Sequence, residues 1–170
     1  MKYGFVLLSS LLLLTSCKKN GTKKINAGNI TVTDAMGQPV GPADPSDWRF
    51  DDGWSAAEQA LFNFADTAST AGMKQAAATR AGAYPNPASE RINFYFSTDQ
   101  PTLLKMVITD ERLNLFYKDT RRLNSSSGYN FTLDLASGAY KNGSFYRIYY
   151  ALYAEGGAIY KRGHGDFKRS

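Results

Sequence analysis

Residues 92–97 read INFYFS, so the apolar side chains Ile92, Phe94 and Phe96 alternate with more polar neighbours. This period of two is typical of a β-strand with one buried face. Further segments carry the same alternation or a high aromatic and β-branched content, and they are residues 104–109, 113–118, 130–135, 145–154 and 158–162. A Glu155-Gly156-Gly157 turn separates the last two. Short strands divided by such turns predict a mainly β chain that folds as an antiparallel β-sandwich.

A helix is predicted before these strands, at residues 55–68. Ser55 and Glu58 match a capping box, in which a hydroxyl and a carboxylate satisfy the first backbone N–H groups of a helix. Apolar residues recur at helical spacing through this segment, and they are Ala57, Ala60, Leu61, Phe64, Ala65 and Ala68. We expect this stripe to pack on the rest of the protein. A membrane or another subunit is the alternative.

The N-terminus has the three parts of an export signal over residues 1–16: a basic Lys2, an apolar run and small residues. The apolar run is shorter than the roughly 20 residues that span a bilayer. Leu14-Thr15-Ser16-Cys17 resembles the lipobox of bacterial lipoproteins, and the resemblance implies cleavage before Cys17 and a diacylglycerol on its sulfur. Cys17 is the only cysteine, so it has no disulfide partner in this chain. An ordinary secretory signal with a chance cysteine is the alternative.

Residues 17–33 are expected to form the lipidated cysteine and a basic tether. The lysines of the tether are Lys18, Lys19, Lys23 and Lys24. Each contributes about 1 kcal/mol near anionic headgroups, although a solvated spacer explains them equally well. The formal net charge of +5 comes from these four and Lys2, because 15 basic residues face 15 acidic ones from residue 25 onward. A near-neutral body gives no reason to expect nucleic-acid binding.

Residues 83–162 carry Tyr84-Pro85-Asn86-Pro87-Ala88, then Arg91-Ile92-Asn93-Phe94, then a Leu133–Tyr140 segment that ends in Ser-Gly-Ala-Tyr. On these motifs the segment resembles the C-terminal sorting domain of type IX secretion, a small Ig-like β-sandwich. The lipobox and the chain end at residues 163–170 depart from that family. We therefore expect an antiparallel Ig-like β-sandwich with one short N-terminal helix, the sandwich over residues 83–170 and a loop plus helix packing on it over residues 34–82.

Two groups of residues invite chemical interpretation. His164 is the only histidine and lies near Asp166, but a zinc site needs three or four ligands, so a histidine in a turn is the expectation. Asp44, Asp47, Asp51 and Asp52 crowd one loop without the spacing of a calcium-binding EF-hand. We expect the neighbouring aromatic residues, Trp48, Phe50 and Trp54, to pin this loop and the helix onto the sandwich.

The segment from Phe145 to Tyr153 is apolar or aromatic on both faces. A strand with one wet face would carry more polar residues. We expect the N-terminal half of the chain to cover its second face. The alternative is an exposed patch that binds a glycan or peptide through Arg147, Tyr149, Tyr153 and Tyr160.

These features predict a non-catalytic lipoprotein without cofactor or metal, anchored through Cys17 at the bacterial outer membrane. Lysines rather than acidic residues follow Cys17, which favours the periplasm-facing leaflet. The expected role is binding, assembly or structural support, with an envelope protein or a glycan as partner. The alternatives are a surface or secreted protein that uses residues 83–170 as a type IX sorting signal, a glycan-binding module with exposed tyrosines, and a hydrolase built around His164.

Overall fold

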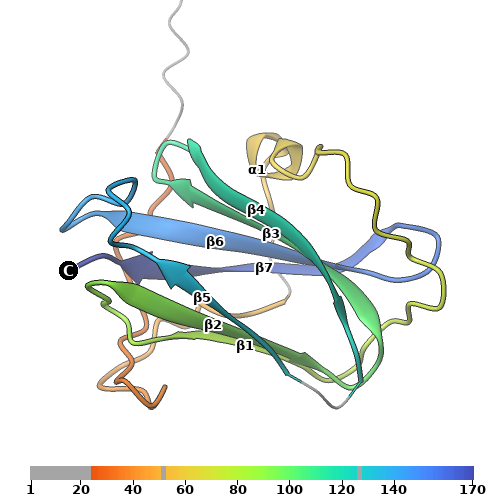
Figure 1. Ribbon diagram of the computed structural model, residues 1–170, viewed down its shortest axis with the longest axis horizontal. Helices are drawn as coiled ribbons and strands as arrows, with labels where there is room; N and C mark the ends of the chain where they lie inside the picture. Colours follow the sequence, from red (N-terminus) through yellow and green to blue (C-terminus); the bar gives the residue numbers. More distant parts are fainter. Residues whose placement is uncertain (1–23, 51–52, 126–127) are drawn as a thin grey trace, which may run out of the picture.

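The computed structural model describes residues 24–50, 53–125 and 128–170. Two antiparallel sheets face each other, and a short helix lies outside one of them (Figure 1). The elements are α1 (Ala56–Ala60), β1 (Thr79–Tyr84), β2 (Arg91–Thr98), β3 (Thr102–Asp110), β4 (Leu115–Leu123), β5 (Tyr129–Asp134), β6 (Phe145–Tyr153) and β7 (Ile159–Lys168). No helix among these residues has the length and hydropathy that crossing a membrane requires.

The strand order is β1-β2-β5 in one sheet and β4-β3-β6-β7 in the other. Strands that follow one another in the chain change sheets between β2 and β3 and again on both sides of β5. This is the Greek-key connectivity of immunoglobulin-like sandwiches. The predicted class, a mainly β antiparallel Ig-like sandwich with one short N-terminal helix, is confirmed.

The main core lies between the two sheets, and the alternation in the sequence selects its residues. Ile92, Phe94 and Phe96 are at most 1% exposed, as the period of two predicts. The facing sheet contributes buried side chains at alternate positions, and they are Leu104, Met106, Ile108, Tyr146, Ile148, Tyr150 and Leu152. Full burial of each such side chain contributes about 1.5–3 kcal/mol, so this layer is the main source of stability.

A second apolar cluster lies on the outer face of the four-stranded sheet. Leu103, Val107 and Tyr149 of β3 and β6 are buried there beneath side chains from the segment that precedes β1. That segment supplies Trp54, Phe62 and Met73. The prediction that the chain's own N-terminal half covers the second face of residues 145–153 is confirmed.

The helix is shorter than residues 55–68. The capping box of Ser55 and Glu58 is present, but α1 ends at Ala60. The next N–H groups bond three residues back, with Phe62 donating to the Gln59 carbonyl at 3.1 Å, and such tightened turns end a helix. The predicted stripe is therefore confirmed only in part: Leu61, Phe64 and Ala68 pack on the sheet, whereas Ala57, Ala60 and Ala65 are exposed and Phe62 is buried in their place.

Asn86, within the Tyr-Pro-Asn-Pro motif, joins residues 24–50, the N-terminal arm, to β7. Its backbone exchanges two hydrogen bonds with Thr33, at 2.9 and 3.1 Å. Its fully buried side-chain amide donates to the carbonyls of Thr31 and Asp166 at 3.0 and 2.9 Å, and its oxygen accepts from the Lys168 N–H. Residues 25–33 form no continuous strand; within them only Thr33 makes isolated bridges.

Candidate functional site

The residues proposed as an exposed aromatic patch are covered. Tyr149 is 0% exposed, and Arg147 and Tyr153 are each 8% exposed. The Tyr149 hydroxyl donates to Glu58 of the capping box at 2.8 Å, and the half-buried Tyr160 hydroxyl donates to Thr102 at 2.9 Å. The patch hypothesis is therefore wrong, because these side chains fix the N-terminal segment to the sheet.

Arg147 forms a buried ion pair with Asp166 across the β6–β7 ladder. Its Nε and Nη2 atoms donate to the two carboxylate oxygens of Asp166, both at 2.6 Å, and Nη2 also donates to the Asn26 carbonyl at 2.7 Å. Burial opposes the charged form of Arg147, but the bonds and charge of Asp166 outweigh it and raise the arginine pKa. A bidentate pair of this kind holds its geometry firmly.

Asp47 places a second carboxylate beside this pair. Its oxygens accept the backbone N–H groups of Thr31 at 2.9 Å and of Asp166 at 3.0 Å. Burial raises the pKa of Asp47, and the negative charge of Asp166 raises it further, from 3.8 to about 6. The carboxylate therefore changes charge close to neutral pH.

Asp47, His164 and Asp166 offer ligand atoms within 4.8 Å of one another. The carboxylate oxygens, however, already accept hydrogen bonds, and the Arg147 guanidinium supplies the positive charge that a cation would bring. The group fits a structural clamp between the N-terminal arm and β7 better than a metal centre. Of the loop aspartates, Asp51 and Asp52 lie outside the described residues.

The raised pKa of Asp47 predicts an effect of pH on stability. A carboxyl group with a higher pKa in the folded state stabilises it fully below pH 3.8, and this contribution disappears as pH rises through about 6. We expect the free energy of unfolding to fall by roughly 1 kcal/mol more between pH 5 and 7.5 in the native protein than in Asp47→Asn. Urea unfolding at the two pH values measures it.

Asp99→Asn is the control for this experiment, since Asp99 is exposed at the far end of the sandwich. Its change with pH should equal that of the native protein. Equal pH dependence in the native protein and Asp47→Asn would show that Asp47 keeps an ordinary pKa.

His164 lies on β7, so the expectation of a histidine in a turn is wrong. A Cβ atom on Gly163 would lie 1.7 Å from the carbonyl oxygen of Arg49, and one on Gly165 would lie 2.4 Å from the Trp48 ring. The glycines thus let residues 48–50 lie directly on the strand. Trp48 stacks on Tyr150 and adopts a φ of 61°, so the prediction that it pins the loop is confirmed.

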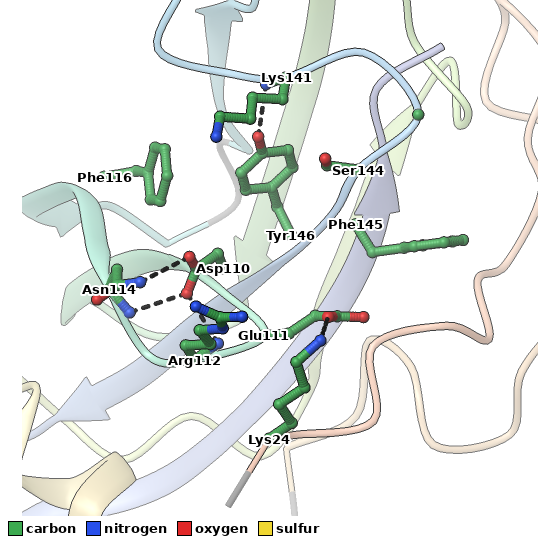
Figure 2. Close-up of a pocket in the computed structure, with 11 residues that line it drawn as sticks. Lys24, Asp110, Glu111, Arg112, Asn114, Phe116, Lys141, Ser144, Phe145 and Tyr146 are labelled. Carbon is green, nitrogen blue, oxygen red and sulfur yellow. Dashed lines mark hydrogen bonds and ion pairs between the residues drawn. The ribbon is translucent and has the colours of Figure 1, made fainter. Parts of the chain in front are cut away.

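A polar cavity of about 550 Å³ opens at one end of the sandwich (Figure 2). Its walls are the β3–β4 turn at residues 110–114 and the loop at residues 141–145. Figure 2 shows Lys141 on one side of the Tyr146 ring and the β3–β4 turn on the other. Phe116 and Phe145 add aromatic surface to the lining. Charged, polar and aromatic groups therefore line the same cavity.

The two carboxylates of this cavity are held by neighbouring groups. Asp110 accepts hydrogen bonds from the backbone N–H groups of Arg112 and Asn114 and from the Asn114 amide, at 2.8 to 3.0 Å. Burial opposes its ionisation, but these bonds outweigh it and lower the pKa of Asp110. Glu111 pairs with Lys24 at 2.8 Å. Among the described residues, neither Arg112 nor Lys141 has a carboxylate within ion-pair distance.

The cavity also marks where the described chain begins. Lys24 lines it, and the Ile25 N–H donates to the Glu111 carbonyl at 2.9 Å. Cys17 itself lies outside the described residues. Apart from the polar Asp110-Glu111-Arg112 turn, nothing in the sequence indicates this cavity, because its walls come from segments far apart in the chain.

Fold and site together define the class as an immunoglobulin-like β-sandwich with an N-terminal arm and a polar cavity at the end where that arm begins. No protein-family model, curated protein or solved structure matches this chain.

Proposed function

We propose that the protein is a non-catalytic lipoprotein of the cell envelope, anchored through Cys17, with a binding, assembly or structural role at the outer membrane. The single observation that carries this is the Leu14–Cys17 motif, which ends an export signal on the only cysteine of the chain. Several acyl chains on one residue anchor stably, since each buried methylene contributes about 0.8 kcal/mol.

The arrangement of polar residues supports a binding or assembly role over a hydrolytic one. Asp47 and Asp166 are the acidic groups beside His164. Their carboxylate oxygens accept hydrogen bonds from backbone N–H groups and from Arg147. A catalytic carboxylate would instead keep an oxygen available for the reacting groups. The cavity at the tether end, with its mixed charges, is the surface best suited to a ligand or an envelope partner.

Replacing the anchor residue tests the proposal. We expect the native protein to sediment wholly with membranes and Cys17→Ser to remain in the soluble fraction, because the thioether cannot form. Mass spectrometry of the native protein should show the diacylglycerol on residue 17. Ser10→Ala, a small change in the same signal, should sediment like the native protein.

Two results would contradict the proposal: an unmodified thiol at Cys17, or a Cys17→Ser protein that still sediments with membranes. Protease treatment of intact cells distinguishes a periplasm-facing protein from a surface-exposed one. A periplasm-facing protein survives it and is digested only after the outer membrane is opened.

A further inference from the structure

We propose that the cavity between the β3–β4 turn and residues 141–145 binds a phosphate group, supplied by the headgroups of the membrane to which the protein is anchored. This inference rests on the proposed function for the source of the phosphate. It rests on the cavity alone for the chemistry.

The first argument is charge. Lys24, Arg112 and Lys141 line the cavity, and its carboxylates are engaged elsewhere: Glu111 by Lys24, and Asp110 by its own turn. Arg112 and Lys141 are exposed and, within the described part of the chain, make no ion pair. The charge of Arg112 also acts on Asp110, but its guanidinium N–H groups and the Lys141 ammonium remain available for charge-assisted hydrogen bonds to phosphate oxygens.

The second argument is the composition of the walls. The Ser144 hydroxyl and the Asn114 amide add neutral polar groups beside the cations. The Phe116 and Phe145 rings supply the aromatic part of the lining, next to Lys24, Arg112 and Lys141. Clustered positive charge next to low-dielectric aromatic surface strengthens the attraction for an anion.

The third argument is reach. Seven residues lead from Cys17 to Lys24, where the described chain begins beside the cavity. Seven residues extend at most about 25 Å, whatever their conformation. An anchor at Cys17 therefore keeps this end of the sandwich close to the bilayer surface, where phosphate headgroups are concentrated.

The test uses the native protein in nanodiscs of phosphatidylglycerol or of digalactosyldiacylglycerol, which contains no phosphate. The readout is the rate of amine acylation at Lys141, relative to Lys74 at the far end, measured by mass spectrometry. We expect Lys141 to react roughly tenfold more slowly in phosphatidylglycerol discs, because the ammonium must first give up a charge-assisted hydrogen bond. Lys74 should react equally in both discs.

Arg112→Ala removes the second cation of the cavity and should abolish most of this protection. Arg80→Ala is the matched control, since Arg80 is exposed at the far end on β1, and it should leave the protection intact. Inorganic phosphate added to the protein in a non-ionic detergent distinguishes binding of free phosphate from binding of lipid headgroups. Protection of Lys141 there shows that the free anion suffices, and protection in discs alone assigns the site to headgroups.

An acylation ratio of Lys141 to Lys74 that is the same in both discs and unchanged by phosphate would overturn the proposal. Protection that survives Arg112→Ala would overturn it as well. A failure of the lipid anchor is distinguishable from both, because the protein would then not enter the discs at all.

Discussion

Replacing Arg147 with alanine lowers the free energy of unfolding by about 4 kcal/mol, since it leaves the Asp166 carboxylate as an unpaired charge in the protein interior. The two side chains are only 10% and 3% exposed, and the Asp47 carboxylate lies beside them. Urea unfolding at pH 7.5 measures the loss.

The pH dependence of Arg147→Ala distinguishes the effect of an unpaired buried charge from the effect of a simple cavity. Without the guanidinium, burial raises the pKa of Asp166 further, so the folded state binds its proton more tightly than the unfolded state does. A raised carboxyl pKa stabilises the fold at low pH and loses that contribution as pH rises. The destabilisation should therefore be smaller at pH 5 than at pH 7.5.

Two further variants complete this experiment. Arg121→Ala breaks an ion pair with Asp119 in which the arginine is 50% exposed, and it should cost less than about 1 kcal/mol. Arg147→Met combined with Asp166→Leu removes both charges and should recover most of the lost stability. If the single and double variants were equally unstable, removing the unpaired charge would restore nothing, and the Asp166 charge would not be the source of the loss.

The sequence predicted the parts of this fold that depend on local periodicity. The alternation at residues 92–97 identifies the buried face of β2, and the apolar second face of residues 145–153 indicates a covering layer. Both inferences succeed because the side-chain period of a strand is two, whatever the strand pairs with. The capping box also predicts where α1 begins, though not where it ends.

The parts that depend on distant pairing could not be predicted. Asp47 accepts a bond from an N–H group 119 residues away, and Asn86 accepts one from 82 residues away. The tyrosines near Arg147 look the same in the sequence whether they face solvent or α1. The polar cavity is similarly invisible, because only the fold brings residue 24 to the β3–β4 turn.

Gly163 and Gly165 show how a strand glycine reports the approach of another segment. In the sequence they resemble flexible neighbours of a catalytic histidine. In the structure each faces the loop at residues 48–50, and the two obstacles differ: Gly163 faces the backbone of Arg49, whereas Gly165 faces the ring of Trp48. A ring can be removed by substitution and a backbone cannot, which allows the two positions to be tested against each other.

Gly163→Ala should cost about 4 kcal/mol in the free energy of unfolding. Its Cβ would stand 1.7 Å from the Arg49 carbonyl oxygen, so residues 48–50 must move away from β7. The movement breaks the 2.6 Å hydrogen bond from the Tyr150 hydroxyl to that carbonyl and separates Trp48 from Tyr150. Overpacking costs about 1–3 kcal/mol and each lost hydrogen bond about 1 kcal/mol. Urea unfolding, followed by near-ultraviolet circular dichroism, measures both the loss and the freed tryptophan.

A second substitution can restore stability only where the new methyl group meets a side chain and not the main chain. Trp48→Leu should recover much of the stability that Gly165→Ala loses, because it removes the ring that the new methyl group meets. It should recover none of the loss in Gly163→Ala, whose obstacle is the main chain. Gly28→Ala, with only an ordinary 3.5 Å contact to Asn26, should change stability by less than about 0.5 kcal/mol. Equal rescue at both positions would mean that the arm does not lie against β7 through its backbone.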